Sequence, residues 1–105
     1  MNQCKITVLR TECYQDLIEE YGVPGLGPCP VLKVGDTFIC GIDQPQGFCA
    51  DAWRAVHPFV FALCQFDEES RFFGGRWVRE PGVAIITCAD GLRPIVMKVE
   101  RYKDD

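Results

Sequence analysis

The chain of 105 residues is long enough for one domain, residues 1–105, with a hydrophobic core of its own. Hydrophobic residues make up 48% and charged residues 25% of the chain, which excludes disordered, collagen-like and coiled-coil proteins. The formal net charge is −4, so the chain lacks the excess of basic side chains that a phosphate backbone needs, and we expect no nucleic-acid partner.

The first half of the chain predicts a strand, a short helix and a hairpin. Residues 4–10 alternate and are rich in β-branched side chains, which is typical of a strand. Residues 14–21 place their apolar side chains on one helical face, and the glycines and prolines of residues 22–30 predict an irregular loop. A Gly-Asp pair between residues 31–34 and residues 37–41 favours a hairpin.

The second half predicts a long helix, a polar loop and two strands. Residues 48–64 carry an apolar stripe at helical spacing, and we expect Pro58 to kink or break this helix because proline lacks an N–H group. Residues 65–76 predict a polar loop with exposed aromatic side chains. Residues 83–88 are apolar on both faces, which favours a central strand, and residues 94–102 form the last strand.

The predicted element order, β-α-β-β-α-β-β, favours an α+β fold. We expect a two-layer sandwich in which a mixed or antiparallel sheet of four to five strands packs against two helices on one face. The first six elements follow a ferredoxin-like order, with one strand added. A small half-open barrel is the alternative.

The chain carries no pattern that places it at a membrane or with a nucleotide. No apolar stretch approaches the ~20 residues that cross a bilayer, and the first residues lack the features of a secretory signal. We therefore expect a cytoplasmic protein whose thiols stay reduced, with no membrane partner. Because neither a GxGxxG motif nor P-loop spacing occurs, no nucleotide cofactor is expected.

Seven cysteines are the most unusual feature of the composition. Their odd number and the absence of any Cys-x-x-Cys pair argue against a disulfide framework, a zinc ribbon and a thioredoxin-type motif. Cys4 and Cys40 alternate with apolar strand residues and Cys64 falls on a helical stripe, so these three are predicted to be core side chains. Cys13, at a turn before a helix, is expected to be partly exposed.

The other three cysteines, Cys29, Cys49 and Cys88, lie at the ends of elements beside loops, where proteins often present functional groups. If folding gathers them, three thiolates can hold a thiophilic metal such as zinc or iron, or a cluster. His57, Asp90 or water would complete a tetrahedral site. The alternative is that each thiol fills a gap in the core and that the single histidine is structural.

A second candidate is the turn that follows the predicted central strand. If it is a tight hairpin turn, Cys88, Asp90 and Arg93 lie close together, and a guanidinium beside a thiol favours the thiolate. Arg93 and Asp90 are then candidate binding residues for a small anionic substrate. The alternative is a surface ion pair on an ordinary turn.

Several motifs together carry a family resemblance from Ile6 to Arg101. They are Gly27-Pro28-Cys29-Pro30, Gly47-Phe48-Cys49 with Trp53, Cys88-Ala89-Asp90-Gly91-Leu92-Arg93-Pro94, and Lys98-Val99-Glu100-Arg101. On these motifs the chain resembles a family of short uncharacterised cysteine-containing proteins of anaerobic bacteria and archaea.

The resemblance implies no particular activity, but it singles out positions. Those are Cys29, Cys49, Trp53, Cys88, Asp90, Gly91 and Arg93. Relatives often carry Cys-Cys before the Asp-Gly turn, whereas this chain has Thr87 at the first of the two positions. The resemblance therefore does not imply a four-thiolate site here, and it places a surface insertion at residues 67–71.

Three functions remain open, and metal or small-ligand binding through the three thiols ranks first. The second is a structural or protein-interaction subunit with buried thiols, whose partner is another protein or a second copy of the chain, and which uses exposed Phe61, Phe72, Phe73 and Trp77 as its contact surface. The third is a thiolate-dependent enzyme that acts on a small anionic substrate.

Overall fold

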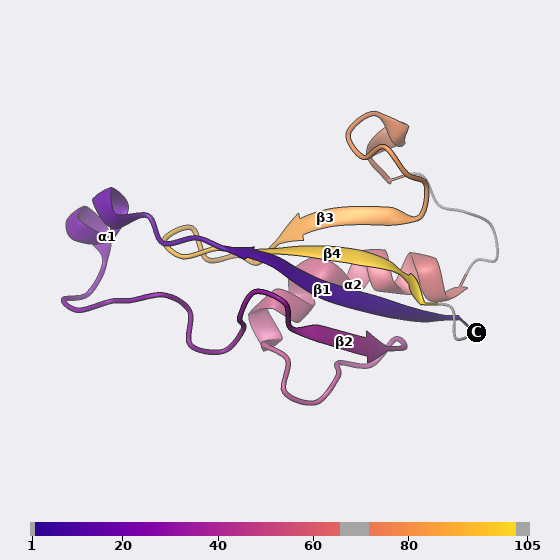
Figure 1. Cartoon of the computed structure of the whole chain (residues 1–105), viewed down its shortest axis with the longest axis horizontal. Helices are drawn as coiled ribbons and strands as arrows, with labels where there is room; N and C mark the ends of the chain where they lie inside the picture. The colour runs from indigo at the N-terminus through magenta and orange to yellow at the C-terminus, as the bar shows by residue number, and fades with distance from the viewer. Residues whose placement is uncertain (1, 66–71, 103–105) are drawn as a thin grey trace.

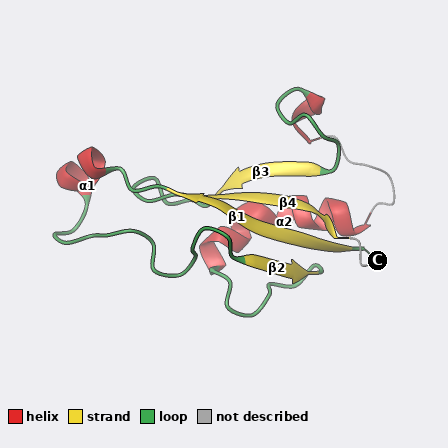
Figure 2. Ribbon diagram, in the orientation of Figure 1, coloured by secondary structure: helices red, strands yellow, loops and turns green. Residues whose placement is uncertain are grey.

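The structure, a computed structural model, describes residues 2–65 and 72–102 and confirms the predicted α+β class (Figures 1 and 2). Four strands form one antiparallel sheet in the order β2-β1-β4-β3. Their bounds are β1 (Gln3–Thr11), β2 (Thr37–Cys40), β3 (Val83–Thr87) and β4 (Ile95–Tyr102). The sheet is therefore antiparallel throughout rather than mixed.

The helix α2 (Ala50–Gln65) lies along one face of the sheet and supplies the other half of the core (Figure 1). Its side chains Val56, Val60 and Leu63 are fully buried. Each such side chain contributes about 1.5–3 kcal/mol by leaving water. The residues that meet α2 alternate along the two central strands, as period 2 requires: Cys4, Ile6 and Val8 on β1, and Ile95, Met97 and Val99 on β4. No helix within the described ranges is long and apolar enough to cross a membrane.

Three thiols belong to this core, as predicted for Cys4, Cys40 and Cys64. The Sγ atoms of Cys4 and Cys64 lie 3.5 Å apart, and the Cys4 thiol also donates to the Val60 carbonyl at 3.6 Å. Cys40 faces Cys4 across the β1–β2 ladder. Burial, together with the neighbouring Cys64, raises the pKa of Cys40 to about 11. Burial and the hydrogen bond with Cys64 also raise the pKa of Cys4, so these thiols are protonated core side chains.

The short helix α1 (Gln15–Tyr21) does not cover the sheet, contrary to the expectation of two helices on one face. It lies beyond one end of the sheet, where only its Ile18 is buried (Figure 1). The chain before it is held by the turn between β3 and β4, because Tyr14 N donates to the Leu92 carbonyl at 2.8 Å. Seven residues offer too little apolar surface for a second covering helix.

Residues 31–34 do not form the predicted first strand of a hairpin, so the element order is one strand short of the ferredoxin-like prediction. The Gly35-Asp36 turn pairs with β1 instead: Val8 N donates to the Asp36 carbonyl, and Gly35 N donates to the Val8 carbonyl, both at 2.9 Å. The Asp36 carboxylate closes the turn by accepting from Lys33 N at 2.9 Å. The backbone of this turn therefore hydrogen-bonds to β1 and not to a neighbouring hairpin strand. The local sequence does not reveal that partner.

The strand β3 lies at an edge of the sheet, so the prediction of a central strand for residues 83–88 is wrong. Ala84 is fully buried beneath α2, while Ile85 on the other face is 41% exposed. An apolar run on both faces normally indicates cover on both sides, but α2 covers only one face of this sheet. The two central positions are taken by β1 and β4.

Of the predicted kink or break at Pro58, the break does not occur, because the helix α2 continues through the proline. The proline removes a hydrogen bond to the carbonyl of Arg54, a residue on the exposed side of the helix where water can solvate that carbonyl. Packing of the opposite face against the sheet then holds the helix together.

The aromatic segment after α2 is only partly the exposed loop that the sequence predicts. Residues 66–71, which include the whole predicted insertion at residues 67–71, lie outside the described residues, and Phe72–Gly75 form one 3₁₀ turn. Phe72 and Phe73 are half-buried against Phe59, at ring distances of 5.1 and 5.6 Å. Trp77 stacks on Phe73 at 4.5 Å and is 76% exposed. Phe61 is exposed, as expected.

Replacing Gly22 by alanine is expected to lower the free energy of unfolding by about 1 kcal/mol. A Cβ atom at Gly22 would lie 2.9 Å from the carbonyl oxygen of Ile18, and this backbone atom cannot move without distorting α1. Urea unfolding measures the effect. Gly27→Ala is the matched control, because a Cβ there meets no atom within 4 Å. Equal stability of the two variants would contradict the argument.

Candidate functional site

The cysteines Cys29, Cys49 and Cys88 line one open cavity of about 520 Å³, together with Asp90 and Arg93. The cavity lies where the loop between α1 and β2, the start of α2 and the turn after β3 meet. All three cysteines are free and half-buried. Three segments far apart in the sequence therefore each contribute one cysteine to the lining of this cavity.

Cys49 stands immediately before α2 and closes the first turn of the helix, because Trp53 N donates to the Cys49 carbonyl at 2.9 Å. The amino end of a helix carries partial positive charge and attracts anionic groups. Phe48 anchors the preceding backbone in the core by edge-on contacts with Phe38 and Trp53, at ring distances of 4.9 and 6.1 Å. The packing of Phe48 before it and the first helical hydrogen bond after it thus fix the backbone of Cys49.

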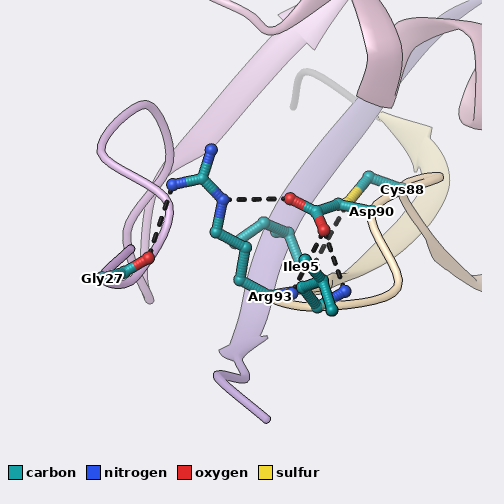
Figure 3. A network of polar contacts seen from close by, with 6 residues as sticks. Gly27, Cys88, Asp90, Arg93 and Ile95 are labelled. Atoms are coloured by element: carbon teal, nitrogen blue, oxygen red, sulfur yellow. Dashed lines mark hydrogen bonds and ion pairs between the residues drawn. The ribbon is translucent and has the colours of Figure 1, made fainter. Parts of the chain in front are cut away.

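Cys88 follows the last residue of β3 and is held by Ile95 of β4. Cys88 N donates to the Ile95 carbonyl at 3.2 Å, and Ile95 N donates to the Cys88 sulfur at 3.4 Å (Figure 3). Hydrogen bonds of this kind stabilise the charge on a sulfur that binds metal. At the end of the β3–β4 ladder, Ile95 N therefore donates to the Cys88 sulfur instead of to the Cys88 carbonyl.

The turn from Cys88 to Arg93 is wider than the predicted tight hairpin turn, and Gly91 does not adopt a positive φ. The side chain of Asp90 closes it: Oδ1 accepts from Leu92 N at 2.9 Å and from Arg93 N at 3.2 Å, and Oδ2 accepts from Arg93 Nε at 3.0 Å (Figure 3). Burial alone would raise the pKa of Asp90, but these hydrogen bonds outweigh it and hold the pKa below its ordinary value.

Arg93 connects two walls of the cavity. Its Nη1 donates to the Gly27 carbonyl at 3.4 Å, so one side chain ties the turn that carries Cys88 to the loop that carries Cys29 (Figure 3). The Arg93 side chain is 28% exposed. The pair with Asp90 is therefore more than a solvated surface ion pair, since it braces the pocket. Pro28 and Pro30 on either side of Cys29 fix two further backbone dihedrals of that loop.

His57 does not line this cavity, although the sequence offered it as a fourth ligand. Its ring lies on α2 between Trp53 and Phe61, at centroid distances of 5.3 and 6.2 Å. Spacing of four residues along the helix explains this stack. Across residues 2–65 and 72–102, no set of three or more His, Cys, Asp or Glu side chains is already arranged to hold a metal ion.

Two contributors to the site escape sequence reasoning. The Gly27 carbonyl is a backbone group whose partner depends on the tertiary fold, so no local signal identifies it. Asp51 also lines the cavity, and its place two residues after Cys49 could have suggested this. Its carboxylate pairs with Arg54 at 2.7 Å on the exposed surface of α2.

Comparison of the chain with family models, with curated proteins and with solved structures found no match. The resemblance drawn from the motifs stays a prediction, and a function has to be argued from the chemistry of the cavity.

Proposed function

We propose that the chain is a small cysteine-based binding protein whose cavity holds a thiophilic metal ion, such as zinc or iron, or a metal cluster, through Cys29, Cys49 and Cys88. The observation that supports this is the arrival of one half-buried free thiol from each of three separate segments at one cavity. Thiolates are the ligands that select these metals over hard cations. Such thiols need a reducing compartment, which fits a cytoplasmic protein.

Metal binding would draw the three sulfurs together, to about 4 Å from one another around a single ion. None of the three cysteines lies within a strand or a helix: Cys29 is in a loop, Cys49 precedes α2 and Cys88 follows β3. All three pack against the edge of the core. We expect the segment with Cys29 to make the largest shift, because it is a loop without regular secondary structure.

Protein purified without oxygen is expected to bind one equivalent of Zn(II) or Fe(II), or to retain a cluster, as measured by elemental analysis and absorption spectra. Serine at position 29, 49 or 88 removes a thiolate ligand, so each variant should bind at least about tenfold more weakly. Cys13→Ser is the matched control, because Cys13 is also a half-buried free thiol but does not line the cavity.

Two results would refute the proposed function. One is wild-type protein that binds none of these metals under reducing conditions. The other is a Cys13→Ser variant that loses as much affinity as the three cavity variants, because binding would then not depend on this cavity.

A further inference from the structure

The sulfur atoms of Cys4 and Cys64 are in direct contact, although the two residues lie 60 positions apart in the sequence. Their distance is 3.5 Å, and both are buried free thiols where the first residues of β1 meet the last turn of α2 (Figure 1). The Cys4 thiol also donates to the Val60 carbonyl at 3.6 Å, so its sulfur is turned toward the helix. Neither cysteine lines the cavity of the proposed metal site, so this pair is separate from it.

The geometry of the pair is close to that of a disulfide. The sulfurs of a disulfide lie about 2.05 Å apart, so those of Cys4 and Cys64 have to approach each other by only about 1.5 Å. The neighbouring backbones are already joined, because Asn2 N donates to the Cys64 carbonyl at 3.2 Å. A bond between the sulfurs therefore requires changed side-chain torsion angles and no rearrangement of β1 or α2.

A reagent can reach this buried pair through the end of α2. Cys64 is the next-to-last residue of the helix, where carbonyl groups have no partner within the helix. The Leu63 carbonyl instead accepts from Asn2 Nδ2 and from Arg101 Nη2, each at 3.4 Å, which is long for hydrogen bonds of this type. The last turn is therefore held weakly, and it can open locally and expose the Cys64 thiol without unfolding of the rest of the helix.

Cys40 is the competing partner for Cys4, because the two residues face each other across the β1–β2 ladder. Both contacts of the Cys4 sulfur given above, with Cys64 and with the Val60 carbonyl, are made to α2. Cys64 is therefore the favoured partner, and a bond to Cys40 is the alternative that an experiment has to exclude.

We propose that Cys4 and Cys64 form a reversible intramolecular disulfide when the chain meets a small organic disulfide, which is the oxidant. The Cys64 thiolate attacks one sulfur of the oxidant, so that its S–S bond breaks, a mixed disulfide forms and one thiolate leaves. The Cys4 thiolate then attacks the Cys64 sulfur, and the second thiolate leaves. The protons of the two cysteines pass to the two released thiolates. One oxidant molecule is thus reduced to two thiols while the two cysteines are oxidised.

The disulfide links the two ends of a long stretch of chain. Because Cys4 and Cys64 lie 60 positions apart in a chain of 105 residues, the bond constrains more than half of the unfolded chain and so stabilises the folded state. The fold is then more stable under oxidising conditions than under reducing ones. The pair is a redox-sensitive modification site that acts on the stability of the fold, and it does not depend on metal binding.

The test treats the whole reduced protein with oxidised glutathione, with a chelator present and without denaturant. Alkylation blocks the remaining thiols, and trypsin digestion with mass spectrometry identifies the bond. We expect the peptide of residues 1–5 to be joined to the peptide of residues 55–71, and reduced glutathione to release it. The oxidised protein should also unfold at a Tm at least about 8 °C higher than the reduced protein.

Cys64→Ala should lose both the cross-linked peptide and the rise in Tm, whereas Cys40→Ala, which also removes a buried core thiol, should keep both. Wild-type protein that leaves residues 1–5 unlinked, or links them to the peptide of residues 34–54 that contains Cys40, overturns the inference without recourse to a variant. A bond that forms only in urea also overturns it, because the contact in the folded state would then not direct the reaction. Since the chelator removes metal throughout, failure of the proposed metal site does not alter these results.

Discussion

Between pH 9 and pH 11, the metal-free protein is expected to lose about 2 kcal/mol of its free energy of unfolding through Cys40 alone. Burial raises the pKa of this thiol from 9.0 to about 11, whereas the unfolded chain releases the proton near the lower value. The unfolded state therefore gains stability as the pH rises through this interval. Below pH 9 the contribution of the buried thiol is fully present.

Cys4 acts in the same direction, because burial and the contact with Cys64 raise its pKa as well. Its sulfur lies 3.5 Å from that of Cys64, so an ionised Cys4 would place a charge beside a second thiol in hydrocarbon. Cys4 and Cys40 thus make the fold sensitive to alkali while leaving its stability near neutral pH intact.

Urea unfolding across this pH range, with a reductant and a chelator present, measures the effect. Cys40→Ala should show a decline about 2 kcal/mol smaller than that of the wild type. Cys13→Ala is the control, since it removes a half-buried thiol outside the core and keeps all three buried ones. Parallel declines of Cys40→Ala and the wild type would show that this thiol ionises equally in both states.

Periodicity predicted the elements that form the core, but not the neighbours of each strand. Alternation in β1 and β4 and the apolar stripe of α2 are local patterns, and each is buried as expected. The edge position of β3 is different, because an apolar run records how hydrophobic the strand is and not which faces are covered. Residues 31–34 were mistaken for a strand for a similar reason, since their turn pairs with Val8, far away in sequence.

The sequence also identified the cysteines of the cavity without determining their geometry. Cys29, Cys49 and Cys88 stand out because the sequence predicts each at the end of an element beside a loop. In the structure Cys29 lies within the loop between α1 and β2, and all three cysteines line one cavity. Local sequence does not determine the spacing of the sulfurs, which depends on how three loops pack. His57 shows the limit of residue type as a guide, because aromatic neighbours on its own helix hold its ring away from the thiols.

Replacing Asp90 by alanine is expected to lower the free energy of unfolding by about 2 kcal/mol. Three N–H groups, from Leu92 and Arg93, lose their acceptor, and hydrogen bonds to a charged group contribute about 1.5–3 kcal/mol each when shielded. The Asp90 side chain is 37% exposed, so water replaces part of this loss. Arg93 is also released from the position in which it reaches Gly27, and the proposed metal affinity should fall about tenfold or more.

The Asp90→Asn variant distinguishes the contribution of the hydrogen bonds within the turn from that of the ion pair with Arg93. Its amide oxygen can still accept from Leu92 N and Arg93 N, but its NH₂ group cannot accept from the guanidinium, so we expect about half the loss of the alanine variant. The wild type should have its full advantage in free energy of unfolding over Asp90→Ala at pH values above 3.8, the ordinary pKa of an aspartate. Because the pKa of Asp90 in the folded state is lower, this advantage should shrink as acid protonates the carboxylate. An Asp90→Ala protein as stable as the wild type would mean that the carboxylate does not hold this turn. The brace between Cys88 and the loop of Cys29 would then need another origin.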